Sequence, residues 1–152
     1  MSYALLLAVH LLAAAFWVGG MAVMNFAVRP AAAATLEPAQ RLPFMAAALA
    51  RFFAGVTLAI ALLLGSGLVL IALGGGFGAM PPSVHLMFGV GLTMIVIFGW
   101  IRLRLFVQLR AALDAGDRPR AAAALDAIRR LVATNLALGS AVFVIAVAGR
   151  AG

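Results

Sequence analysis

Four stretches of the chain are almost entirely apolar, and the charged residues gather in two of the connections between them. The apolar stretches cover residues 3–28, 52–73, 84–106 and 131–149. Each is long enough to cross the roughly 30 Å core of a bilayer as a helix, which needs about 20 residues. The pattern predicts an all-α integral membrane protein whose four transmembrane helices form a single domain over residues 1–152.

The connections predict how the helices are joined. Residues 31–51 carry Pro38 and Pro43, and their apolar residues recur at helical spacing, which indicates a short interfacial helix or a helical extension of the second span. The uncharged residues 74–82 form a turn, and Ser83 is a candidate N-cap for the third span. Residues 120–130 predict a short surface helix before the fourth span. Short connections favour an up-down-up-down four-helix bundle.

Composition agrees with this class and excludes others. Hydrophobic residues make up 66% of the chain, and the mean hydropathy is +1.19, whereas a soluble domain is about half apolar. There is no cysteine, which excludes disulfides, thiolate metal sites and thiol catalysis. The net charge of +7 comes from arginines that flank the spans, so lipid headgroups explain the charge and we expect no nucleic-acid partner.

The distribution of the arginines predicts the orientation of the bundle. The connections after the first and third spans carry nearly all of them, and the connection after the second span carries none. Positively charged connections remain in the cytoplasm, so we expect both termini on the periplasmic side of a bacterial inner membrane. The N-terminal apolar run has no basic start and continues past residue 24, which favours a retained span over a cleaved signal peptide.

The two histidines are the principal candidates for chemistry. His10 lies within the first apolar span, where an ionisable side chain costs a few kcal/mol and marks a functional site by default. His85 lies early in the third span, and both belong to the outer half of the bundle. Diagonal helices about 11 to 14 Å apart leave space for a haem between two imidazoles, and Gly89 adds room. The plainer alternatives are a packing hydrogen bond for His10 and an interfacial position for His85.

Other residues add weaker signals. Trp17 and Trp100 lie inside their spans, which favours core packing over interfacial anchoring, with cofactor stacking as an alternative for Trp17. Arg150, on the outer side, is a candidate partner for a haem propionate. Several methionines resemble a soft-ligand set for Cu(I), although methionine also fills apolar cores, and two of them are alternative metal ligands: Met87 and Met94. Polar residues at the inner ends of spans are candidates for interhelical hydrogen bonds: Asn25, Thr134 and Asn135.

A set of short motifs resembles bacterial membrane proteins of the CopD-like family, named after copper resistance protein D. They are His10-x6-Trp17-x-Gly19-Gly20, Arg29-Pro30, Arg51-Phe52-Phe53, His85-Leu-Met87 with Gly91 and Met94, and Arg129-Arg130-Leu-Val-x-x-Asn135-Leu-x-Leu-Gly139. The resemblance implies copper uptake or tolerance at the inner membrane. The wider group is similar to HemJ, which is linked to protoporphyrinogen oxidation, and to b-type membrane cytochromes. HemJ proteins have a lysine before the histidine, whereas this chain has no lysine.

Three hypotheses follow. The first is a haem b protein with a redox or electron-transfer role, His10 and His85 being the axial ligands and a quinone or another redox protein the partner. The second is a copper transporter or binder that uses histidine and methionine ligands. The third is a structural subunit, and glycines in the second and third spans permit a homodimer. No span contains an acidic residue and no hydrolase or Walker motif is present, so cofactor-based redox chemistry is the catalytic route left open.

Overall fold

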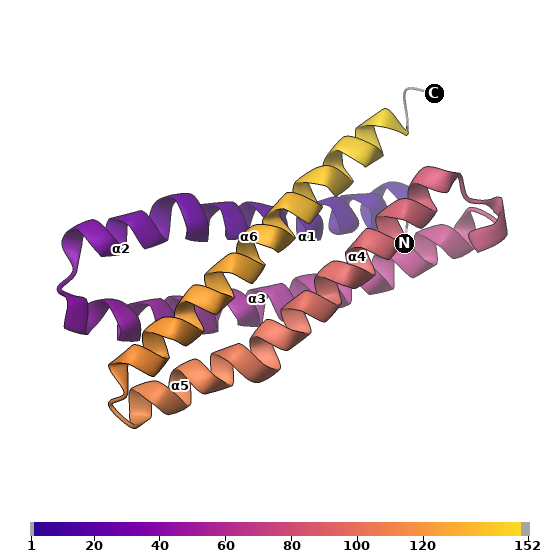
Figure 1. Ribbon diagram of the computed structural model, residues 1–152. Coiled ribbons are helices and arrows are strands. Elements are labelled where there is room, and N and C mark those ends of the chain that lie inside the picture. Colours follow the sequence, from indigo (N-terminus) through magenta and orange to yellow (C-terminus); the bar gives the residue numbers. More distant parts are fainter. Residues whose placement is uncertain (1, 150–152) are drawn as a thin grey trace.

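The computed structural model describes residues 2–149 and consists of four long helices joined by tight turns (Figure 1). Two of the four contain a five-residue π-helical segment that continues the helix without a break. In chain order the elements are α1 (Tyr3–Val23), η1 (Met24–Val28), α2 (Arg29–Thr35), α3 (Pro38–Leu73), the 3-10 turn η2 (Phe77–Ala79), α4 (Pro82–Trp100), η3 (Ile101–Leu105), α5 (Phe106–Asp114) and α6 (Arg118–Ala148). This part of the chain contains no strand, and the predicted all-α class is confirmed.

All four helices are long and apolar enough to cross a membrane. Counted through their π segments they have 33, 36, 33 and 31 residues. At 1.5 Å per residue they are about 47 to 54 Å long, which is well beyond the roughly 30 Å of a bilayer core. The protein is therefore a multi-pass membrane protein whose helices continue past the hydrocarbon region.

The separate interfacial helix predicted for residues 31–51 is absent, and the helical-extension alternative is what the structure shows. The first helix runs on to Thr35, and α3 begins at Pro38 after a two-residue break in which Leu36 is extended. Residues 118–130 likewise form the start of α6, so the predicted surface helix there was wrong as a separate element. These extensions stay helical because they bury apolar side chains against one another: Met45, Leu49, Leu109, Ala112 and Ala121.

The turns use residues suited to them. Gly75 and Gly76 have φ of 97° and 86°, a region in which an L side chain is strained. Asp117 caps α6 by accepting a hydrogen bond from the backbone N–H of Arg120 at 3.0 Å. The predicted N-cap at Ser83 was wrong, because α4 begins one residue earlier with Pro82 in its first turn.

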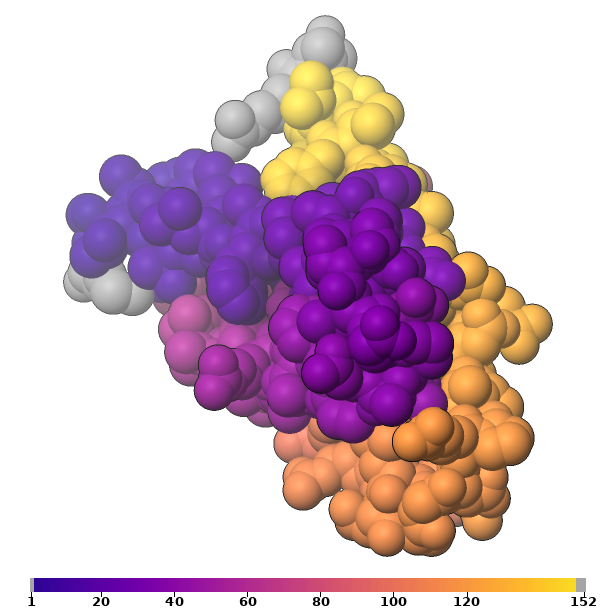
Figure 2. All heavy atoms as spheres, turned by 90° about the vertical axis from the view of Figure 1, so that its left-hand side faces the viewer, coloured from indigo at the N-terminus to yellow at the C-terminus, as the bar shows by residue number. Residues whose placement is uncertain are grey.

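The helices alternate in direction, as an up-down-up-down bundle requires, and form two antiparallel hairpins (Figure 1). α1 packs mainly on α3, and α4 with α5 packs mainly on α6, while α1 and α6 join the two hairpins. At the end that carries the first and third connections, which faces the viewer in Figure 2, the first part of α3 packs on α5. We refer to this end, where most of the arginines lie, as the arginine end.

The tightest packing lies in the middle and toward the arginine end. An edge-to-face cluster joins three helices, with ring centroids 6.2 Å apart for Trp17 and Phe98, 5.6 Å for Phe53 and Phe98, and 5.4 Å for Phe53 and Phe106. By contrast, none of the described residues of α4 that precede Met94 is buried. The opposite half of the bundle therefore leaves much of its apolar surface to lipid.

Candidate functional site

His10 lies in the seam between α1 and α3. It shares one face of α1 with Leu6, Ala13 and Trp17, which are all buried. Its Nδ1 is 2.9 Å from Oγ of Ser66. Gly67 makes room for the imidazole, because a Cβ there would lie 3.1 Å from His10 Cε1. A hydrogen bond from this membrane histidine was predicted to a neighbouring carbonyl, whereas the bond present joins it to a serine hydroxyl on the neighbouring helix.

The hydrogen bonds of Ser66 fix which nitrogen of His10 carries the proton. Ser66 Oγ donates its single hydrogen to the Leu62 carbonyl oxygen of its own helix. It can therefore only accept from His10, so Nδ1 of His10 is the protonated nitrogen. The lone pair of Nε2 is left available, which is the arrangement of a histidine oriented by an outer partner for metal binding.

His85 has a different environment. It lies on the exposed side of the first turns of α4, where its Nδ1 donates to the Pro81 carbonyl oxygen at 3.2 Å. Its ring lies 6.0 Å from that of Phe77 in the preceding turn. These contacts are local, and none of those described joins His85 to His10. Its predicted interfacial character agrees with this exposure, while a haem shared by the two histidines stays a prediction.

One contact between three helices sets their relative depth. A Cβ added to Gly139 of α6 would meet Val18 of α1 at 2.6 Å and Met94 of α4 at 3.1 Å, so these residues lie at one level. Ten or eleven residues along each helix from this level, which is about 15 Å, an arginine follows. These arginines are Arg29, Arg104 and Arg129.

The same count places the histidines. If the arginines mark one boundary of a bilayer core roughly 30 Å thick, its midplane falls near Gly139. His10 precedes Val18 by eight residues and His85 precedes Met94 by nine, so each lies about 12 to 14 Å from that midplane. On this assumption each histidine would lie near the opposite boundary, while exposed Arg51, next to the Phe52 that packs at Gly20, would lie within the core.

The two tryptophans differ. Trp17 is 4% exposed and packs edge-on against Phe98, so its predicted core role is confirmed. Trp100 is 56% exposed, and the guanidinium of Arg104 lies 5.8 Å from its ring centroid. The expectation that Trp100 packs inside the bundle was wrong, because it lies on the surface at the level of the arginines, where an amphipathic ring is stable.

The remaining predicted residues are placed as follows. Gly89 is exposed, and a Cβ there would meet nothing within 4 Å, so it borders open space. Met94 is 4% exposed and lies against α6, and Met87 lies two turns nearer the histidine end, partly buried. Arg150 falls outside the described residues.

Asn135 confirms the prediction of an interhelical hydrogen bond. It is 1% exposed, and its Nδ2 donates to the backbone carbonyl oxygen of Met94 at 3.0 Å. Its Oδ1 is buried without a hydrogen-bond partner among the described residues. Thr134 does not follow the prediction, since its hydroxyl donates within its own helix to Arg130.

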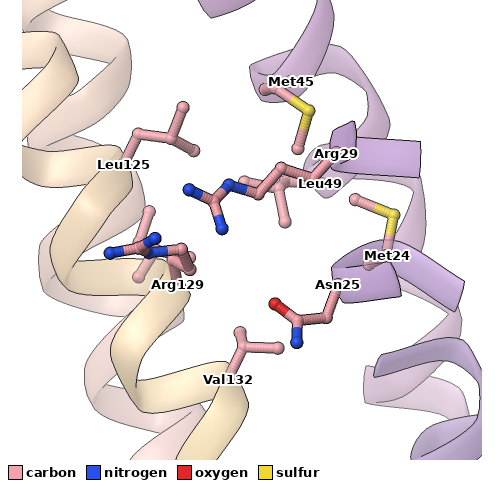
Figure 3. Close-up of a pocket in the computed structure, with 9 residues that line it drawn as sticks. Met24, Asn25, Arg29, Met45, Leu49, Leu125, Arg129 and Val132 are labelled. Atoms are coloured by element: carbon pink, nitrogen blue, oxygen red, sulfur yellow. The ribbon is translucent and has the colours of Figure 1, made fainter. Parts of the chain in front are cut away.

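A cavity at the arginine end was not predicted from the sequence. It has a volume of about 40 Å³ and lies between η1 with the start of α2, α3 and α6 (Figure 3). Arg29 and Asn25 reach into it from one side and Arg129 from the other, as Figure 3 shows. Its other lining residues are apolar: Met24, Met45, Leu49, Leu125, Ile128 and Val132. The spacing Asn25-x-x-x-Arg29 was the available signal, since it places both side chains on one helix face.

Among the described residues, no group of three or more His, Cys, Asp or Glu side chains could hold a metal ion. The candidate metal ligands in this part of the chain are therefore single histidines together with methionines. A larger groove of about 410 Å³ beside Pro43 and Arg110 also lies at the arginine end. Neither this groove nor the cavity at Arg29 includes His10 or His85.

Residues 46–148 match the sequence model of the family described as copper resistance protein D, or CopD. The chain belongs to the CopD family. The match covers about two-thirds of the chain, from the first part of α3 through α6. No curated protein and no solved structure matches the chain. The predicted CopD resemblance is confirmed, while the likeness to HemJ and to b-type cytochromes stays a prediction.

The family match and the histidine site overlap only in part. Ser66, His85, Met87 and Met94 fall within the matched residues, whereas His10 precedes them. In this CopD-family protein the partner of His10 therefore belongs to the shared region, and the imidazole is contributed by the segment ahead of it.

Proposed function

We propose that this CopD-family protein handles copper in the bacterial inner membrane, taking up Cu(I) at the histidine end of the bundle. The observation that carries the proposal is the match to the copper resistance family over residues 46–148. The positive-inside pattern of the arginines favours a periplasmic location for the termini, and with them for the histidine end. Copper arriving in the periplasm would then meet this end first.

The first ligand in this proposal is Nε2 of His10. Ser66 holds the imidazole with that nitrogen available, and the site lies near the boundary of the bilayer. An oriented neutral imidazole is a suitable ligand for copper. His85 lies at a similar depth on α4 and is the second imidazole available at this face, on the exposed side of the helix.

Methionines continue a series of soft ligands into the membrane. Met87 lies at about the depth of His10, Met94 is buried at the level of Gly139, and Met21 is buried one turn beyond Trp17. Thioether sulfur binds Cu(I) in preference to hard cations, and it remains neutral in an apolar core. The order His10, Met87, Met94, Met21 is the route that the depths support.

The distribution of acids supports a soft monovalent ion over a hard divalent one. All four carboxylates of the sequence lie in the connections at the arginine end: Glu37, Asp114, Asp117 and Asp126. A divalent hard ion in the bilayer needs oxygen ligands and neutralising charge, which the spans do not supply. A single positive charge with sulfur and imidazole ligands costs less to desolvate.

Competition with a chromophoric Cu(I) chelator under anaerobic reducing conditions tests the proposal on the purified protein in detergent. We expect the wild type to retain Cu(I), His10→Ala to bind at least about tenfold more weakly, and Met94→Leu to be weakened as well. Met80→Leu is the matched control, because Met80 packs on Gly74 in the second connection and is not one of the proposed ligands. Retention no better than that of a copper-free buffer blank would contradict copper binding.

An absorption spectrum of the same protein supplied with haem distinguishes copper binding from haem binding. Copper binding without a Soret band supports the proposal. The opposite result is a protein that retains no copper and shows a Soret band that is lost in both His10→Ala and His85→Ala. This result would replace the copper proposal with the hypothesis of a bis-histidine haem b protein that has a redox role.

A further inference from the structure

The cavity at Arg29 brings two guanidinium groups from distant parts of the sequence to one space. Arg29 comes from the start of α2, and Arg129 comes from α6 one hundred residues later. Figure 3 shows both side chains directed into the cavity, with the side-chain amide of Asn25 beside them. Like charges that share a cavity repel one another, so a bound anion would stabilise this arrangement.

The nearby carboxylate is already engaged. Asp126 Oδ1 lies 2.6 Å from Arg129, and its Oδ2 lies 3.2 Å from Arg130. No ion pair of Arg29 is found among the described residues. One carboxylate thus faces three arginines, and the cavity keeps a net positive charge.

The position of the cavity identifies the kind of anion. Arg29 directly follows the apolar stretch 3–28, and Arg129 with Arg130 directly precedes the apolar stretch 131–149. Arginines at the ends of membrane spans lie in the headgroup region. Exposed Trp100 lies about one turn ahead of Arg104, and its ring contacts that guanidinium, as residues near the interface do. Phospholipid phosphates are the anions concentrated at this depth.

The lining also suits an amphipathic ligand. Apolar side chains surround the two arginines and belong to three different helices: Met24, Met45, Leu49, Leu125, Ile128 and Val132. One water molecule needs about 10 to 15 Å³ of cavity volume. A cavity of about 40 Å³ therefore has room for a small anionic group and for nothing larger. The glycerol and acyl chains of a lipid would extend from it along the apolar helix surfaces.

We propose that Arg29, Asn25 and Arg129 form a binding site for the phosphate of an anionic phospholipid in the leaflet at the arginine end. Arginine suits this role, because its planar fork donates two hydrogen bonds to a phosphate. The π segment η1 ends directly before Arg29 and contains Asn25, so it sets where both side chains enter the cavity. A lipid held there bridges α2 and α6, the two hairpins of the bundle.

Native mass spectrometry of the detergent-purified protein, titrated with phosphatidylglycerol, tests the site. We expect one lipid to bind the wild type more tightly than phosphatidylcholine does. Arg29→Gln should weaken this binding at least about tenfold, because it removes a charge-assisted contact. Arg29→Lys should fall between the two, since it keeps the charge and loses the fork. Arg51→Gln is the control, because Arg51 is an exposed arginine within α3 that does not line the cavity.

Three results would overturn the proposal. The first is an equal loss of phosphatidylglycerol binding in Arg51→Gln and Arg29→Gln, which would show that binding depends only on the total positive charge. The second is equal binding of the two lipids by the wild type. The third is inorganic phosphate displacing phosphatidylglycerol at matched concentration, which would assign the site to a free anion. Helicity of each variant, measured by circular dichroism, shows that the bundle remains folded, and none of the experiments uses copper.

Discussion

At the scale of single residues, Ser66 determines what His10 can do. A serine hydroxyl has one hydrogen, and here the Leu62 carbonyl accepts it. The imidazole must then donate from Nδ1, and Nε2 becomes the ligand. The serine therefore acts as the outer partner that orients a metal-binding histidine, although it lies on another helix.

Ser66→Ala tests this role. Loss of the hydroxyl frees the imidazole to rotate and to change tautomer, so we expect Cu(I) binding to weaken about tenfold with little change in helix content. Chelator competition measures the affinity. Ser140→Ala is the control, because the Ser140 hydroxyl donates only within its own helix to Leu136. Equal affinity in Ser66→Ala and the wild type would contradict the assigned role.

Asn135 carries the corresponding polar contact in the buried middle of the bundle. Its Nδ2 joins α6 to α4 through the Met94 carbonyl. In membrane proteins such bonds contribute about 0.6 kcal/mol on average, because the separated helices also find partners.

We expect Asn135→Ala to lower the free energy of unfolding by about 1 kcal/mol, through the lost bond and the small void. Unfolding in mixed micelles with increasing dodecyl sulfate, followed by circular dichroism, measures the change. Thr134→Ala should leave it almost unchanged, since that hydroxyl is bonded within α6. A larger loss in Thr134→Ala than in Asn135→Ala would argue against the interhelical role.

At the scale of elements, one glycine holds three helices together. Gly139 admits Val18 and Met94 because it has no side chain, and an alanine Cβ would meet Val18 at 2.6 Å. Small residues of this kind allow close approach where lipid removes most of the hydrophobic driving force between helices.

Gly139→Ala should therefore destabilise the bundle by about 1 kcal/mol, since the overpacking outweighs the better helix propensity of alanine. Gly99→Ala provides the comparison. Gly99 borders open space, so Gly99→Ala should raise the free energy of unfolding slightly through helix propensity alone. The same unfolding assay measures both, and a stabilised Gly139→Ala would show that the helices can move apart at this level without cost.

The sequence predicted the elements well where hydrophobicity alone decides them. Four spans, their order and the interhelical bond of Asn135 followed from apolar length and from polar residues at span ends. The extents of the helices could not be predicted, because residues 29–51 and 105–130 mix charged residues with alanines and resemble surface segments. Only the burial of Leu109, Ala112 and Ala121 in the structure shows that these segments pack against one another.

The candidate site was predicted in part for a similar reason. His10 and His85 were found as ionisable groups in apolar spans, on the half of the bundle that carries the second connection. Ser66 was missed as the partner of His10, since it reads as a small packing residue beside two glycines. The cavity at Arg29 was missed because it needs the register between α2 and α6, which no local pattern contains.

At the scale of the whole molecule, charge and membrane position are linked. The helices are longer than a bilayer core is thick, and the arginine end buries alanine and leucine side chains such as Leu109, Ala112 and Ala121. This end is positively charged, which favours the cytoplasmic side under the positive-inside rule.

Reporter fusions test the orientation. Alkaline phosphatase, which is active only in the periplasm, should be active when inserted at Gly76 in the second connection and inactive at Ala115 in the third. A fluorescent protein that folds only in the cytoplasm should give the reverse result. Active phosphatase at Ala115 would invert the orientation and place the histidines on the cytoplasmic face.

The two π segments are the places where the bundle should best tolerate a shorter chain. A π turn holds one residue more than an α turn. Deleting one codon within residues 24–28 should let the π turn close to an α turn, so the helix beyond it would keep nearly the same phase and Arg29 would still face Arg129. The same deletion in a regular α segment would rotate everything beyond it by about 100°. Residues 101–105 form the second such place, directly ahead of Phe106 of the aromatic cluster.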